Sequence, residues 1–192
     1  MYPAKRIEDD YNDNRPKSEA HARAEVGQFL AEPLEQLYTP SAWLYGYSVA
    51  LILRDLAAAD ALCRSAQATF SSDGQATFHT HMALALCARQ TGEDATTELT
   101  SAYFAMKAAD LDQQRRMQPT WNMLKAIYRN QAKAFNDALF IALNLHYEGS
   151  EGAVWGSAGH LAIVPLGLCC LAREEGIHVE VQSAAIPHWL FA

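Results

Sequence analysis

Two histidines separated by one residue, His79 and His81, have a spacing that can chelate a metal ion. Such a pair shares one ion when it lies on a strand, because residues two apart then point to the same face. Here the flanking residues follow a helical period, and positions two apart on a helix point about 200° away from each other. We therefore expect two separate imidazoles and no metal at this motif.

Two adjacent cysteines, Cys169 and Cys170, are followed by His178 and His188 and could form a redox or metal site. Neighbouring positions on a helix diverge by about 100°, so the two thiols cannot share a ligand, and a disulfide between them would be strained. The spacing of all four cysteines matches neither a CxxC metal pattern nor a secreted disulfide framework. Cysteine is often buried, and we predict reduced thiols that pack in the core.

A glycine-rich segment, residues 148–159, is flanked by the best remaining cluster for catalysis. His146, His160 and the nearby Glu148 and Glu151 could support a metal-dependent hydrolase, and we keep that activity as an alternative. However, the chain has no HExxH motif or nucleophile elbow, and the glycines fit neither a P-loop nor a GxGxxG pattern. We therefore predict no catalytic residue, no cofactor and no metal site.

The same segment carries a lone tryptophan, Trp155, which is a candidate anchor for a protein partner. Tryptophan is enriched at interface hot spots. Glu148 and Glu151 would then offer carboxylates to Arg or Lys of a basic partner. The alternative is that Trp155 folds back onto the core of its own chain.

The composition predicts a soluble protein without a nucleic-acid ligand. The chain of 192 residues has a net charge of −7 and no apolar run near the roughly 20 residues that a membrane-spanning helix needs. Phosphate binding needs a basic patch, so the charge argues against nucleic acid and favours a basic protein partner. The first residues lack the apolar segment of a signal peptide. We expect a cytoplasmic protein that contacts neither membrane nor nucleic acid.

Helical periodicity begins at Ser18 and recurs as far as Gly176, interrupted by a turn signal at SSDGQ and by residues 148–159, which we expect to form a long exposed loop. Ser18 and Ser41 are candidate N-caps, and Pro33 breaks or bends the first run. Residues 41–70 form one long helix or two in sequence. Further helices are expected over residues 18–38, 76–91 (ended by Gly92), 93–111, 119–147 and 160–175.

The helix expected over residues 119–147 has Pro119 near its first turn and apolar residues at steps of three and four. Its second half, ALFIALNL, is apolar nearly all round, so we expect that half to cross the centre of the domain.

Residues 177–183 alternate apolar and polar side chains, which is a strand signal, but no partner strand is visible in the sequence. We expect this segment to lie extended on the helices. The fold predicted from these elements is an all-α, single-domain helical bundle of about six to eight helices with a short extended C-terminal segment. The domain is expected over residues 18–192, behind a flexible arm of residues 1–17.

The C-terminal part of the chain, residues 120–192, resembles a family of bacterial immunity proteins, immunity protein 49, which act against polymorphic toxins. The resemblance includes the helix AKAFNDALFIALNLHYE, the glycine-rich segment and the stretch HLAIVPLGLCCLAREEGIHVEVQSAAIPHWL. It centres on Leu166, Leu168, Leu171, Ala172, Gly176, Val179, Val181, Ser183, Pro187 and Leu190.

This resemblance implies a mostly helical, non-catalytic protein that binds a cognate toxin, of the kind delivered between bacteria by systems such as type VI secretion, and occludes its active site. If the toxin is a nuclease, its phosphate-binding cleft is basic. Glu148, Glu151, Asp110 and Asp112 could then mimic the charge of the substrate, with Trp155 as the anchor. The resemblance transfers no functional residue position by position. A helical scaffold or adaptor with several weaker partners remains an alternative.

Overall fold

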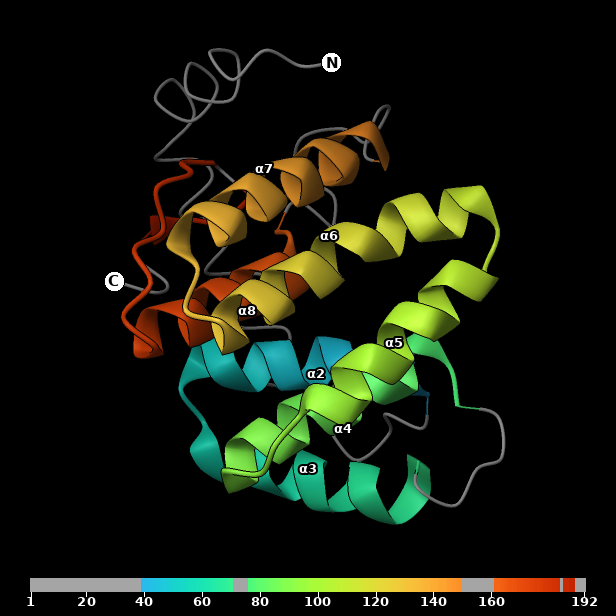
Figure 1. The fold of residues 1–192 in the computed structure, drawn as a ribbon. Helices are drawn as coiled ribbons and strands as arrows, with labels where there is room; N and C mark the ends of the chain where they lie inside the picture. The colour runs from blue at the N-terminus through green and yellow to red at the C-terminus, as the bar shows by residue number, and fades with distance from the viewer. Residues whose placement is uncertain (1–38, 71–75, 150–160, 184, 189–192) are drawn as a thin grey trace.

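The computed structural model describes residues 39–70, 76–149, 161–183 and 185–188 of the chain (Figure 1). The arm predicted over residues 1–17 and the helix predicted over 18–38 lie outside these residues. The described part is all-α, as predicted, and contains seven helices. They are α2 (Pro40–Leu53), α3 (Leu56–Phe70), α4 (Phe78–Thr91), α5 (Thr96–Ala108), α6 (Leu111–Tyr128), α7 (Ala132–Gly149) and α8 (Ile163–Glu174).

Helix α2 is the most enclosed part of the bundle, because it packs against α3, α4 and α8. Its residues from Trp43 to Ile52 are buried except Tyr45. The prediction that residues 138–145 cross the centre is wrong. Those residues belong to α7, which packs on α6 and α8 with one face and leaves Ile141 49% exposed on another. Among the described helices, none is long and apolar enough to cross a bilayer.

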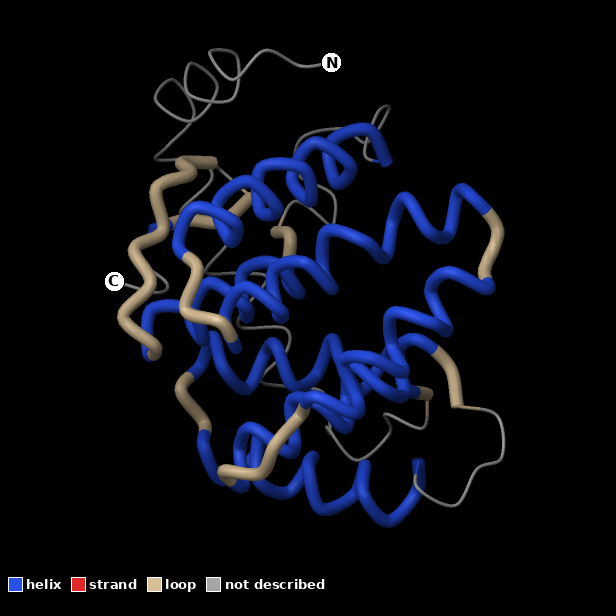
Figure 2. Tube along the Cα trace, in the orientation of Figure 1, coloured by secondary structure: helices blue, strands red, loops and turns tan. Residues whose placement is uncertain are grey.

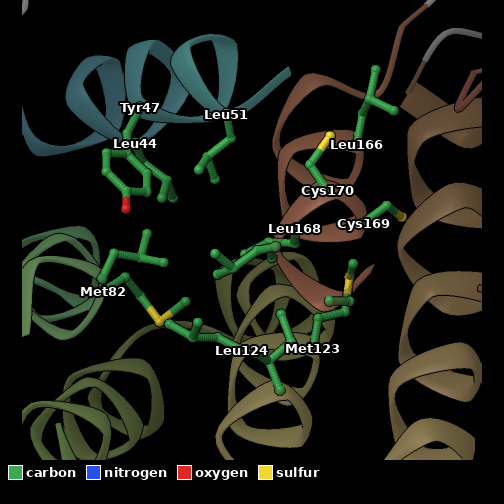
Figure 3. Close-up of a cluster of buried hydrophobic side chains, with 14 of the residues drawn as sticks. Leu44, Tyr47, Leu51, Met82, Met123, Leu124, Leu166, Leu168, Cys169 and Cys170 are labelled. Atoms are coloured by element: carbon green, nitrogen blue, oxygen red, sulfur yellow. The ribbon is translucent and has the colours of Figure 1, made fainter. Parts of the chain in front are cut away.

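Helix α8 crosses α2 at a point of very close approach. Gly167 of α8 lies directly against Ser48 of α2, and a Cβ atom added at Gly167 would be 2.6 Å from the Ser48 Cβ. Small residues at a crossing allow two helix backbones to approach closely. Figure 3 shows part of the surrounding core. It includes Leu44, Tyr47 and Leu51 of α2, Met82 of α4, Met123 and Leu124 of α6, and Leu166, Leu168, Cys169 and Cys170 of α8.

A turn at Asn130 divides the single helix that was predicted over residues 119–147. Asn130 has a φ of 49°, in the left-handed region that asparagine tolerates better than most residues. The N–H of Gln131 donates to the carbonyl of Ala126 at 2.9 Å, which closes the end of α6. Pro119 lies inside α6 and not in its first turn. The periodicity on both sides of Asn130 is helical, so periodicity alone does not predict the turn.

The other helix boundaries follow local capping chemistry. Residues 41–70 form two helices, one of the two predicted outcomes, because Arg54 adopts a left-handed φ of 57°. The N-cap of α2 is Thr39 and not the predicted Ser41, since Thr39 Oγ1 accepts from the N–H of Ala42 at 3.2 Å and Pro40 opens the helix. Gly92 ends α4 with a φ of 75°, as predicted.

The residues from 175 to 183, after α8, run along the bundle without helix or strand structure (Figure 2). Gly176 turns the chain with a φ of 76°. Ile177 and Val179 are buried, whereas His178 and Glu180 are exposed, so the predicted alternation holds. The side-chain amide of Asn136 in α7 makes two hydrogen bonds to the backbone of this segment. It donates to the carbonyl of His178 and accepts from the N–H of Glu180.

Candidate functional site

Three of the predicted partner-binding residues lie where α6 begins and α7 ends. Asp112 and Glu148 line one pocket of about 190 Å³, together with Arg115, Arg116 and Leu145. Asp110 caps the adjacent start of α6, because its Oδ1 accepts from the N–H of Gln113 at 2.9 Å. The other two predicted residues, Glu151 and Trp155, lie outside the described residues.

The carboxylates in this pocket are paired with arginines of the same chain. Arg115 Nη2 contacts Glu148 Oε2 at 2.7 Å, and Arg116 Nε contacts Asp112 Oδ2 at 2.8 Å. The Asp112 carboxylate raises the pKa of Arg116. The pocket is therefore a charge-balanced surface and not a free acidic patch.

The histidines singled out by their spacing have different neighbours. His81 Nδ1 lies 2.7 Å from Glu98 Oε2 of α5, and the ring of His79 packs edge-on against Phe78. Burial lowers the pKa of His79. His146 lies in the last turn of α7, but its proposed partner His160 is outside the described residues. Within the described ranges, no three His, Cys, Asp or Glu side chains are grouped closely enough to hold a metal ion.

The four cysteines are all buried, which confirms the predicted packing of Cys169 and Cys170. Burial raises the pKa of Cys169 well above its ordinary value and raises that of Cys170 to about 12, with a contribution from Glu174. Thiolates are the reactive form of cysteine, so both burial and protonation make these side chains unreactive in the folded protein.

We therefore expect a thiol reagent such as Ellman's reagent to modify none of the four cysteines until the protein unfolds. Absorbance should then report four thiols per chain in denaturant. A Lys133→Cys variant is the matched control, because that side chain is 87% exposed and should react at once. Rapid modification of Cys169 and Cys170 in the native protein would contradict the buried assignment.

A second surface, which the sequence analysis did not single out, lies along α5 and α6. The rings of Tyr103 and Trp121 are 5.1 Å apart. Lys107 Nζ is 5.7 Å from the centre of the Tyr103 ring, and Lys125 Nζ is 4.6 Å from that of Trp121. Phe104 adjoins Tyr103. We call these five residues the aromatic–lysine face.

The sequence carries a signal for this face. An aromatic residue is followed four positions later by a lysine twice, at Tyr103 with Lys107 and at Trp121 with Lys125. Residues four apart on a helix are neighbours, so this spacing places an ammonium group near a ring. Tyr103 and Trp121 are partly buried against the core, whereas the lysine side chains extend over their rings.

Comparison with known proteins yields one result. A family model described as Immunity protein 49 matches residues 11–190. Neither the curated proteins nor the solved structures contain a match.

Proposed function

The chain belongs to the immunity protein 49 family, since the match covers residues 11–190 of 192, and we propose that it binds and neutralises a cognate bacterial toxin. The toxin is a polymorphic toxin that acts in the cytoplasm, and the immunity protein occludes its active site. Family membership carries this proposal. No chemical step on the immunity protein is required, because a bound protein that covers an active site excludes the substrate.

The net charge of −7 supports a toxin with a basic surface, such as a nuclease. We propose that Asp110, Asp112 and Glu148 contact this surface, together with Glu151 and Trp155. Because Asp112 and Glu148 already bind Arg116 and Arg115, a toxin arginine would have to exchange with them. Exchange between exposed ion pairs gains little free energy, at most about 1 kcal/mol. Most of the affinity must come from another part of the interface.

Co-expression with the protein encoded by the adjacent reading frame tests the proposed function. That neighbour should arrest growth when expressed alone, and this chain should restore growth by forming a complex with a Kd on the order of nanomolar or tighter. An empty vector and an unrelated acidic helical protein are the controls. A neighbour that is harmless alone, or that stays lethal in the presence of this chain, would show that the proposed function is wrong.

A further inference from the structure

We propose, on the basis of the function above, that the aromatic–lysine face is the surface on which the toxin docks. The occupant is a toxin segment that presents apolar side chains flanked by carboxylates. This face is distinct from the pocket of ion pairs between α6 and α7, and it supplies the affinity that those pairs cannot.

The apolar part of the face is exposed without a structural reason. Phe104 of α5 is 65% exposed, and Leu111, the first residue of α6, is 82% exposed. Solvated side chains of this size gain free energy when a partner covers them, and aromatic residues are frequent among interface hot spots. The turn that joins α5 to α6 lies at the edge of the bundle (Figure 1), so a second protein can approach both helices there.

The charge of the face is opposite to that of the whole chain. Within the described residues, no ion pair joins Lys107 or Lys125 to a carboxylate, whereas Arg115, Arg116 and Lys133 each have an acidic partner. Both ammonium groups lie near aromatic rings, which attract them through the ring quadrupole. Two positive charges without carboxylate partners, beside exposed apolar surface, are complementary to an acidic and apolar partner segment.

The face is also held in place before binding. The indole N–H of Trp121 donates to the carbonyl of Leu99 at 2.9 Å, which joins α6 to α5. The Tyr103 ring packs against the indole in a tilted arrangement and limits its movement on the other side. A fixed aromatic surface loses little conformational entropy on binding, and this raises the affinity for a given contact area. An aromatic surface with lysines could also bind single-stranded nucleic acid, but the net charge of −7 opposes that ligand.

The test measures binding of the toxin encoded by the adjacent reading frame to the full chain and its variants by titration calorimetry. We expect Phe104→Ala to weaken binding about 30-fold, as a hot-spot residue does. The double variant Lys107→Glu, Lys125→Glu should weaken binding by about 10-fold or more and reduce its dependence on salt. Leu56→Ala on α3, where the side chain is 60% exposed, and Lys133→Glu on α7 are the matched controls and should bind within about twofold of the wild type.

The outcomes separate this inference from the proposed function. Unchanged unfolding midpoints for the variants would show that the losses arise at the interface. Hydrogen exchange of the complex should slow over residues 100–107 and 118–125. If the wild type protects cells but the variants bind equally well, or exchange slows only elsewhere, the docking surface is wrong and the function stands. If the wild type binds a single-stranded oligonucleotide through this face, the protein-docking assignment is overturned. If the wild type does not bind the toxin at all, both proposals fail.

Discussion

Replacing Gly167 with leucine should lower the free energy of unfolding by about 3 kcal/mol, because the side chain has no space at the crossing of α8 with α2. A Cβ atom at this position would lie 2.6 Å from the Cβ and 2.7 Å from the Cα of Ser48. Backbone atoms cannot rotate away as a flexible side chain can. The two helices would have to separate, and the core contacts around Leu166 and Leu168 would loosen with them. Urea unfolding followed by circular dichroism measures the effect.

Gly167→Ala separates the steric effect from helix propensity. Alanine favours a helix over glycine by about 1 kcal/mol, so an uncrowded position would gain stability. We expect a net loss here. Adding Ser48→Gly should restore stability only in part, because the contact with the Ser48 Cα remains. Gly92→Ala is a control with open space around its Cβ, and it should show only the cost of a left-handed φ, about 1 kcal/mol. A Gly167→Ala protein at least as stable as the wild type would contradict the close crossing.

Local chemistry made several features of the fold predictable from the sequence. Gly92 and Gly176 end helices because a left-handed conformation costs glycine little. The break near Arg54 and the turn at Asn130 were harder, since neither residue requires a left-handed φ. The turn at Asn130 is stabilised by the packing of α6 against α7, which is a tertiary effect absent from a periodicity pattern.

The position of the central helix could not be read from composition either. The segment ALFIALNL of α7 is as apolar as the core of α2, yet Ile141 reaches solvent. One difference is the packing around α2, where Ser48 lies directly against Gly167 and lets α8 approach closely. Apolarity indicates that a helix prefers burial, but the space around it depends on its neighbours.

The acidic residues of the candidate site could be predicted from the sequence, but their ion pairs could be predicted only in part. Asp110, Asp112 and Glu148 were selected for their charge, and the fold does bring Asp112 and Glu148 to one pocket. Their pairing with Arg116 and Arg115 was not foreseen. The pairing of Asp112 with Arg116 follows from a spacing of four residues, whereas that of Arg115 with Glu148 depends on how α6 and α7 pack. Only the first could be found from the sequence.

The second large effect is expected at Asn136, whose side chain takes the place of a partner strand for the C-terminal segment. Its Nδ2 donates to the carbonyl of His178 at 2.9 Å, and its Oδ1 accepts from the N–H of Glu180 at 2.8 Å. This is the pairing that a neighbouring strand would give through its own peptide groups. The alternation in residues 177–183 is therefore a true strand-like pattern whose hydrogen bonds are made by a helix side chain.

Asn136→Ala should lower the free energy of unfolding by about 2 to 3 kcal/mol, because it removes both of these part-buried hydrogen bonds. Asn136→Asp tests the two bonds separately, since it keeps the acceptor for Glu180 but cannot donate to His178 while it is ionised. It should also be less stable than the wild type. Tyr147→Phe is the milder control. It loses one hydrogen bond to Ser183 and should lower the free energy of unfolding by about 1 kcal/mol.

Limited proteolysis shows whether Asn136→Ala loses stability locally, in the C-terminal segment. A non-specific protease should cut Asn136→Ala within residues 177–180 faster than it cuts the wild type, while α2 and α8 stay intact, because the two amide bonds and the burial of Ile177 and Val179 hold this part of the segment. Cleavage at the wild-type rate would mean that those two apolar side chains hold the segment without Asn136. In that case the alternation alone, and not the amide, would account for how the chain lies on the bundle.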